Sequence, residues 1–131
     1  QSFFSAAPPE VAAARRKAAQ DIRGVSVVPP PLSALSNLGL PDGPIADWLK
    51  RRLTPHPIET YETPLRLANP SIGNGRPCTY VAFTQPAFPG PEPSRRWARV
   101  QQGWGWMELP SGHDAPITVP DKVAELLSGI G

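Results

Sequence analysis

The sequence predicts a domain of the α/β class, and the second half of the chain carries this prediction. Residues 78–84 are a nearly continuous run of apolar and β-favouring side chains, which is typical of a strand buried on both faces. Residues 104–109 alternate with a period of two, which indicates a second strand, and residues 94–102 between them form a helical pattern. Strand, helix and strand in this order favour parallel neighbours joined by a right-handed crossover.

Two helices are expected in the first half, and each begins with proline. The first covers residues 8–23, with proline in the first turn and an acid near the positive end of the helix dipole, and Gly24 is expected to end it. The second begins at Pro44, after the turn signal Pro41-Asp42-Gly43, and stops at Thr54-Pro55. The side chains expected to face inward are Val11, Ala14, Ala18 and Ile22 in the first helix and Ile45, Trp48, Leu49 and Leu53 in the second.

The remaining segments complete the expected order of elements. Residues 58–67 are expected to be extended, and residues 69–77 and 85–93 are expected to be loops. A last helix opens at residues 119–121, with Asp121 as its cap or first-turn acid. The apolar side chains of this last helix recur at i, i+3, i+4 and i+7, and they are Val123, Leu126, Leu127 and Ile130. The side chains expected to face inward from the helix at 94–102 are Trp97 and Val100.

Composition excludes several classes of protein. The chain has 131 residues and a formal net charge of +2, and its short basic runs at 15–17 and 50–52 lie on expected helices as solvated faces. No basic stripe interleaves with aromatic side chains, so nucleic acid is not an expected partner. The single cysteine, Cys78, excludes an internal disulfide framework and an all-cysteine metal site. Two strands cannot make an independent sheet, so further strands are expected from elsewhere.

His113 is the candidate functional residue. Pro110-Ser111-Gly112 end the second strand, which places His113 on a loop just past a strand end, followed by Asp114. An imidazole has a pKa near neutral pH and suits a general base. A histidine at such a place can equally be a hydrogen-bonded structural residue, and spacing alone leaves both interpretations open. His56 lies between two prolines, which favours a structural or surface role.

Three stretches carry a resemblance to a known family. They are residues 48–67 (Trp-Leu-Lys-Arg-Arg-Leu-Thr-Pro-His-Pro-Ile-Glu-Thr-Tyr-Glu-Thr-Pro-Leu-Arg-Leu), Thr79-Tyr80-Val81, and residues 109–127 with their Gly-His-Asp. On these residues the chain resembles the C-terminal half of bacterial α/β-hydrolases related to plant methyl-salicylate esterases and hydroxynitrile lyases. The resemblance implies the C-terminal portion of an α/β-hydrolase fold, a parallel sheet flanked by helices, with a mainly helical cap at residues 1–68 and core at residues 69–131.

The resemblance also implies a catalytic role for His113. In these enzymes the triad follows the chain order serine, acid, histidine, and the histidine lies on a loop between a strand and the terminal helix. No metal or organic cofactor is implied. The cap implies an apolar substrate pocket, and the candidate lining residues, each of which can equally belong to the cap core, are Phe3, Phe4, Leu35, Leu38, Trp48 and Leu49.

Two parts of the triad machinery are missing from the sequence. No Gly-x-Ser-x-Gly occurs, so the serine nucleophile and the oxyanion hole are expected in a separate N-terminal half of the same hydrolase. Plant relatives carry the acid just past the first strand, where this sequence has Thr84-Gln85-Pro86. Glu92 and Asp114 are alternatives, and an acid in the partner chain is preferred. Either a precursor is cut in an exposed loop before the cap, or the sequence is one piece of a longer protein.

These features lead us to expect a serine-dependent hydrolase of carboxylic esters or lactones. A hydroxynitrile lyase would use the same triad plus a lysine near the pocket, and Lys17, Lys50 and Lys122 all fall on polar helix faces. A non-catalytic ligand-binding module on the same fold is the alternative from another class. A small apolar ester is the expected ligand. No apolar run approaches the length that crosses a bilayer, so a membrane is not an expected partner.

Overall fold

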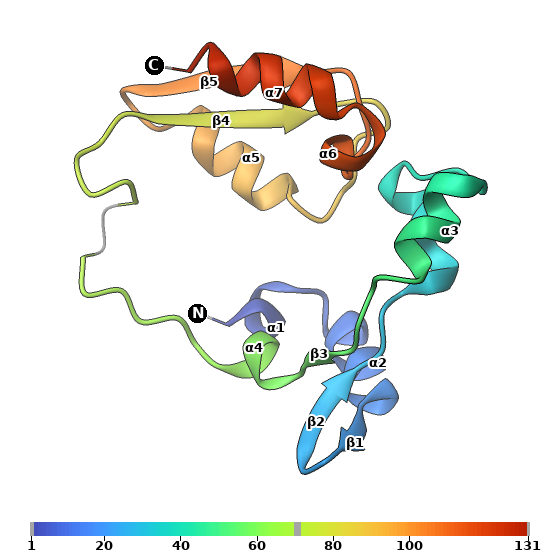
Figure 1. Cartoon of the computed structure of the whole chain (residues 1–131). Helices are drawn as coiled ribbons and strands as arrows, with labels where there is room; N and C mark the ends of the chain where they lie inside the picture. Colours follow the sequence, from blue (N-terminus) through green and yellow to red (C-terminus); the bar gives the residue numbers. More distant parts are fainter. Residues whose placement is uncertain (1, 70–71, 131) are drawn as a thin grey trace. The chain divides into compact units, whose positions relative to one another are not determined.

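The computed structural model describes residues 2–69 and 72–130. The chain forms two compact units, the first made of residues 1–31 and 52–70 and the second of residues 32–51 and 71–131 (Figure 1). The strands follow this division, with an antiparallel sheet in the first unit and a parallel pair in the second. This mixture of helices and strands is compatible with the predicted α/β class.

The first unit is a small antiparallel sheet with short helices around it. In chain order its elements are α1 (Phe3–Ala6), α2 (Pro9–Ala18), β1 (Gln20–Ile22), β2 (Val25–Val28), β3 (His56–Pro57) and α4 (Glu59–Glu62). The central strand is β2. Phe4 is buried with Ala12, Val28 and Ile58, and the ring of Tyr61 stacks on Phe4 with centroids 5.5 Å apart. The core of this unit therefore draws on residues from both segments that form it.

The prediction that the first helix runs to Arg23 is wrong, because α2 is followed directly by the β1–β2 hairpin. Arg23 and Gly24 have φ angles of 54° and 80°, and Ile22 pairs with Val25 across them. A two-residue loop with both φ angles positive is the type I′ turn, which matches the twist of the strands it joins. The Asp21 carboxylate accepts a hydrogen bond from the Gly24 amide at 3.0 Å. Gly24 therefore turns a hairpin instead of ending a helix.

The predicted inward face of this helix is wrong for the same reason. Ala12 is the buried residue of α2, whereas Val11 is exposed and Ile22, which lies in the hairpin, is 45% exposed. The apolar spacing that suggested one helical face includes Ile22, which lies in β1 beyond the end of α2 at Ala18. The pairing of β1 with β2 overrides that spacing.

The prediction of extended chain over residues 58–67 is wrong at Glu59–Glu62, which form the helix α4. Ile58 is buried, and its carbonyl accepts the amides of Tyr61 at 2.9 Å and Glu62 at 3.3 Å. These two bonds wind one turn of helix, which brings Tyr61 onto Phe4.

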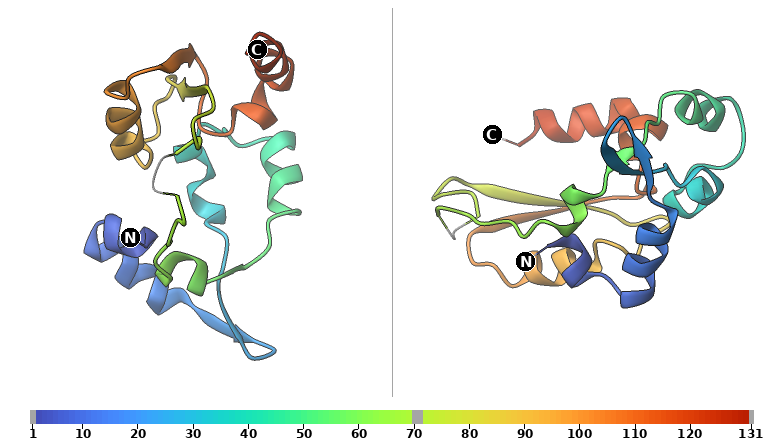
Figure 2. Two further views of the ribbon diagram at one scale, coloured as in Figure 1. Left: turned by 90° about the vertical axis from the view of Figure 1, so that its left-hand side faces the viewer. Right: turned by 90° about the horizontal axis from the view of Figure 1, so that it is seen from below.

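The second unit is built around the parallel pair. Its elements are η1, a 3-10 helix (Leu32–Leu38), α3 (Pro44–Lys50), β4 (Cys78–Phe83), α5 (Glu92–Arg99), β5 (Trp104–Leu109), α6 (Ala115–Thr118) and α7 (Pro120–Ser128). The register runs from Cys78 opposite Trp104 to Phe83 opposite Leu109. Figure 2 shows α5 and α7 on opposite faces of this pair. The prediction of two parallel strands connected through a helix is confirmed.

In α3 the predicted start at Pro44 is confirmed and the predicted inward face is wrong. Ala46 is buried in this helix, whereas Ile45 and Trp48 are exposed. The helix ends at Lys50, before the predicted stop at Thr54-Pro55.

Aromatic side chains connect α5 to one face of the strands. Trp97 meets Trp104 edge to face with centroids 5.1 Å apart. The guanidinium of Arg99 lies 4.3 Å from the centroid of Trp106, so a cation–π contact adds to this packing. The predicted inward face of this helix is wrong: Trp97 is 41% exposed, and Val100, which follows the last residue of α5, is 75% exposed. The buried residue of α5 is Ala98.

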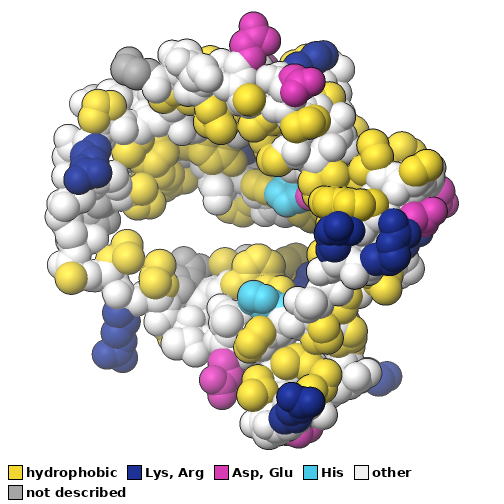
Figure 3. Space-filling model, viewed as in Figure 1, with side chains coloured by type: hydrophobic (Ala, Val, Ile, Leu, Met, Phe, Trp, Pro, Cys, Tyr) yellow, Lys and Arg dark blue, Asp and Glu magenta, His cyan; other side chains and the backbone are white. Residues whose placement is uncertain are grey.

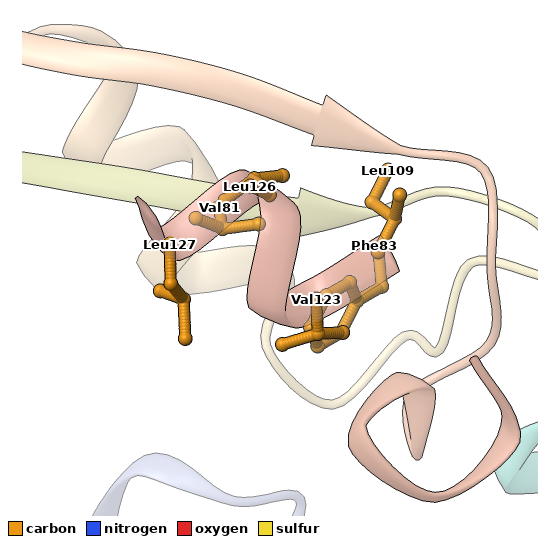
Figure 4. A pocket seen from close by; sticks show the side chains of 6 residues that line it. All are labelled: Val81, Phe83, Leu109, Val123, Leu126 and Leu127. Carbon is orange, nitrogen blue, oxygen red and sulfur yellow. The ribbon is translucent and has the colours of Figure 1, made fainter. Parts of the chain in front are cut away.

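The other face of the strands carries α7. Val123, Leu126 and Leu127 lie over the strands and enclose an apolar hollow of about 60 Å³ (Figure 4). The strand side chains that line this hollow are Val81, Phe83 and Leu109. The predicted apolar stripe is confirmed for Val123 and Leu126, which are half-buried, whereas Leu127 is 56% exposed and Ile130 lies beyond the end of α7. Asp121 is in the first turn, as expected.

Candidate active site around His113

The His113 loop lies at the carboxyl end of the parallel pair, between β5 and α6. The Thr84 amide donates to the Leu109 carbonyl at 3.1 Å, and the Gln85 amide donates to the Ser111 carbonyl at 3.0 Å. These bonds continue the ladder past the strands, so the loops that follow β4 and β5 run side by side. The carboxyl end of a parallel sheet is where α/β proteins place their ligand sites. The predicted position of His113 is confirmed, and its chemical role stays a prediction.

Backbone contacts hold the His113 loop on both sides of the histidine. The Asp114 amide donates to the Leu38 carbonyl at 3.4 Å. Gly112, which precedes His113, is buried against the backbone of Gly39. The segment that follows η1 therefore fixes the residues before and after the histidine.

The ring of Phe88 packs against the imidazole of His113. The ring centroids are 4.8 Å apart, and the planes are inclined at 44°. Phe88 comes from the proline-rich loop that follows β4. The backbone of Gly90 makes room for this ring, because a Cβ there would lie 2.6 Å from Cε1 of Phe88. The histidine therefore has an apolar, aromatic neighbour on the side of this loop.

Asp114 is partly buried beside His113. Loss of solvent raises the pKa of the Asp114 carboxyl above its ordinary value of 3.8, and the charge of the neighbouring His113 opposes this shift. The Oδ2 atom is buried and has no hydrogen-bond partner within residues 2–69 and 72–130. This oxygen does not hold the imidazole, so the described residues do not supply a carboxylate–histidine pair through it.

Glu92, the other acid considered from the sequence, is engaged on α5. Its carboxylate forms ion pairs with Arg95 at 3.2 Å and Arg96 at 3.3 Å. These i,i+3 and i,i+4 pairs support the helix. In the described part of the chain its oxygens do not bond His113.

The six residues expected to line a substrate pocket are divided between the two units. Phe3 and Phe4 belong to the first unit, where Phe4 is 6% exposed and forms part of the core. In the second unit Leu35 is buried and Leu38 contributes its carbonyl to the His113 loop. The remaining two, Trp48 and Leu49, lie on α3. Phe4 is therefore a core residue, which was the alternative to a pocket residue in the sequence analysis. A substrate pocket lined by these residues stays a prediction.

A second hollow, of about 450 Å³, lies at the amino ends of the strands, away from the His113 loop. Its lining residues are Pro77, Thr79, Gly105, Trp106, Met107, Gly129 and Ile130. Over residues 2–69 and 72–130, no group of three or more His, Cys, Asp or Glu side chains gathers as a metal ligand set. Within the same residues no helix has the length and hydropathy that a membrane crossing requires.

Two residues of this site, Phe88 and Gly39, were not identified from the sequence. Phe88 is the one aromatic residue in residues 85–93, and this was the available signal. Gly39 follows an irregular segment and resembles any turn glycine. Both act through contacts with residues that are distant in sequence.

The chain is similar to a carbendazim hydrolyzing esterase of Nocardioides sp. (strain SG-4G). The two are 33% identical over 88 residues, which cover 65% of this chain and 35% of that protein. The chain thus spans about a third of the length of this curated relative. No family model matches the sequence, and no solved structure matches it. The similarity points to an esterase or hydrolase relationship.

Proposed function

We propose that this chain supplies the histidine base of a serine-dependent hydrolase of carboxylic esters or lactones. The observation that carries the proposal is the place of His113, on a loop at the carboxyl end of two parallel strands and just before the C-terminal helices. This is the place of the triad histidine in α/β-hydrolases. The similarity to an esterase supports the same activity class.

In this proposal His113 moves the protons of a two-step acyl transfer. Its imidazole accepts the hydroxyl proton of a serine as that oxygen attacks the ester carbonyl, and it then donates the proton to the leaving alcohol. In the second step it accepts a proton from water, which attacks the acyl-serine and releases the acid. A lactone would follow the same steps with its alcohol and acid in one product.

The serine and the oxyanion hole are proposed to lie in the remaining part of the enzyme, the N-terminal half of the same hydrolase. The sequence contains no Gly-x-Ser-x-Gly, and it spans about a third of its esterase relative. A two-stranded sheet is marginal alone, and in the described residues β4 pairs only with β5. A further strand on the open edge of β4 would complete the sheet and cover that edge.

Several large apolar side chains of the second unit are exposed. Leu127 is one of them, and it borders the hollow lined by Val81 and Phe83 of β4, beside the strand that an N-terminal half would pair with. Apolar side chains reach the surface in the view of Figure 3. The large apolar residues exposed in the second unit include Ile45, Ile72, Trp97, Val100, Leu127 and Ile130.

The triad acid is proposed to come from the same N-terminal half. Glu92 is held by two arginines, and Asp114 Oδ2 has no partner among the residues described. A carboxylate that orients the imidazole must accept the ring N–H, and within residues 2–69 and 72–130 neither Glu92 nor Asp114 does so.

The test is labelling and turnover of the purified enzyme that contains this chain. Wild-type protein is expected to react with a serine-directed fluorophosphonate and to hydrolyse p-nitrophenyl acetate, with carbendazim as a second substrate. His113→Ala should abolish both while the protein stays folded. His56→Ala is the matched control, because His56 is exposed and packs edge to face on Tyr61 in the first unit.

Each result decides between the alternatives. Equal turnover by wild type and His113→Ala would remove the histidine assignment. Absence of labelling in the wild type would favour a non-catalytic binding module, and release of cyanide from a cyanohydrin without ester turnover would favour a hydroxynitrile lyase. Intact masses under native and denaturing conditions test the partner: a 14.1 kDa chain with a second, Gly-x-Ser-x-Gly chain supports the two-chain form, while one larger chain overturns it.

A further inference from the structure

The backbone of Gly39 crosses that of Gly112 in close contact. A Cβ added at Gly39 would lie 2.7 Å from the Gly112 Cα, and one added at Gly112 would lie 2.8 Å from the Gly39 Cα and 3.0 Å from the Leu38 carbonyl oxygen. Atoms that are not bonded do not approach so closely, so this crossing accommodates hydrogen alone at both positions. Gly39 also has a φ of 87°, which other residues adopt at a cost.

Hydrogen bonds hold both chain segments of this crossing, the one that contains Gly39 and the one that contains Gly112. On one side the Gly39 amide donates to Ser36 at 3.0 Å, and the Leu40 amide donates to Leu35 at 3.1 Å. Leu40 is 1% exposed, so this side is fixed in the interior. Hydrogen bonds and burial therefore hold the segment after η1, against which the segment containing Gly112 packs.

On the other side the contacts bracket His113. Gly112 comes immediately before the histidine, and its carbonyl accepts the Ala115 amide at 3.2 Å. Asp114 comes immediately after, and its amide donates to the Leu38 carbonyl at 3.4 Å. The one residue between these two contacts is His113.

We infer that the Gly39–Gly112 crossing positions the His113 loop, so that Leu38 and Gly39 act as positioning residues for the reaction through the backbone. This inference rests on the proposed function. A catalytic group displaced by about 1 Å loses roughly 100-fold in rate. A side chain added at Gly39 or Gly112 has no room, because its Cβ would meet the other backbone. It therefore displaces one of the two chain segments, and His113 moves with it.

Three alanine variants separate the contact from backbone strain. Gly112→Ala adds a Cβ to the crossing at a residue whose φ is outside the left-handed region. Gly103→Ala is the matched control, because Gly103 has a φ of 77° and a Cβ there would meet nothing within 4 Å. Gly39→Ala combines both effects.

The first readout is kinetic. In the enzyme that contains this chain, Gly112→Ala and Gly39→Ala are expected to lower kcat about 100-fold with KM within about threefold. Gly103→Ala is expected to keep the wild-type kcat while losing some thermal stability. Wild-type kcat in Gly112→Ala would overturn the inference. Failure of the wild type to turn over any ester would instead remove the proposed function.

The second readout does not depend on activity. In the enzyme that contains this chain, the imidazole signals of His113 and His56 are assigned in NMR spectra by their loss in His113→Ala and His56→Ala, and Gly112→Ala should shift that of His113 while leaving that of His56 unchanged. No shift of His113 would overturn the inference. If Gly112→Ala does not fold, the wild type decides: an NOE between the α protons of Gly39 and Gly112 supports the crossing, and its absence overturns it.

Discussion

Phe88 and His113 lie ring against ring, with centroids 4.8 Å apart, although they come from the loops that follow two different strands. The loop after β4 thus reaches the loop after β5 with an aromatic side chain. Such a ring restricts the rotation of the imidazole and keeps water from one of its sides. Phe88 is in this respect a neighbour that helps to set the orientation of the imidazole.

We therefore expect Phe88→Ala to lower kcat in the enzyme that contains this chain. Aromatic pairs contribute about 0.5–1.5 kcal/mol beyond burial, which corresponds to a loss of roughly two- to tenfold. Phe88→Tyr keeps the ring and is expected to keep most of the activity. Steady-state kinetics on p-nitrophenyl acetate measure both, and equal rates for the Ala and Tyr variants would contradict the role of the ring.

Asp114 predicts a dependence of stability on pH. Because burial raises its pKa in the folded protein, the folded state binds the proton more tightly than the unfolded chain. The contribution of Asp114 to the free energy of unfolding is fully present below its ordinary pKa of 3.8, where the carboxyl is protonated in both states. This contribution is lost as the pH rises through the raised pKa of the folded state. Asp114→Asn stays neutral, so it should melt at a higher temperature than wild type at pH 7, with the difference vanishing below pH 3.8.

The control for this prediction is Asp121→Asn, in the exposed first turn of α7. An acid there interacts favourably with the helix dipole, so its loss should lower stability by about 0.3–1 kcal/mol. Thermal melts from pH 3 to 8 compare the two variants. A lower melting temperature for Asp114→Asn at pH 7 would show that the carboxylate has a favourable charged partner.

The same Asp114→Asn variant tests the triad acid. Loss of the acid in a serine triad lowers kcat by about 10⁴-fold. Since Oδ2 of Asp114 has no hydrogen-bond partner in the described residues, we expect Asp114→Asn to retain activity close to wild type. A loss approaching the triad value would assign the acid to Asp114 instead of the N-terminal half.

The β1–β2 turn predicts a stabilising substitution. Arg23 has a φ of 54°, a conformation that asparagine adopts more readily, and Asn-Gly is the preferred type I′ pair. Arg23→Asn should stabilise the hairpin by roughly 0.5–1 kcal/mol. Arg51→Asn, at a helical φ of −72°, removes the same charge and should give no gain. Amide exchange of β1 and β2 measures both, and equal protection in the two variants would contradict the prediction.

The contact of α7 with the strands predicts a loss on truncation. Leu126 is half-buried over the apolar hollow shown in Figure 4, and burying a leucine fully is worth about 1.5–3 kcal/mol. Leu126→Ala should therefore cost about 1–2 kcal/mol. Glu125→Ala, one residue earlier and exposed, should change stability by less than about 0.5 kcal/mol. Denaturant unfolding of both variants gives the comparison, and equal midpoints would show that α7 does not pack there.

The sequence predicted the second half of the fold well because each element there has a complete local pattern. The two strands have apolar patterns typical of their class, α7 has an apolar spacing typical of a helix, and the loop that carries His113 is bounded by Pro110 and Gly112. In the first half the pattern failed where pairing partners decided the structure. Arg23-Gly24 reads equally as a helix end or a hairpin turn, and only the partner strand β2 distinguishes the two.

The candidate site was predicted only in part, for the same physical reason. The position of His113 follows from the element order around it. Its contacts do not, because Phe88 is 25 residues earlier in the chain and Gly39 is 73 residues before Gly112. A single sequence has no local signal for such pairs. The catalytic acid and nucleophile remain proposals that concern the rest of the enzyme.

The spacing of the parallel ladder has a consequence for the order in which the chain folds. Each residue of β4 pairs with the residue 26 positions later in β5, whereas the β1–β2 hairpin pairs residues three to seven positions apart. A hairpin closes within about 1–10 μs, while distant pairing must first overcome a larger loop entropy. The hairpin is therefore expected to form early and the parallel pair late. Because the His113 loop depends on that pair, the histidine reaches its place in one of the last steps of folding.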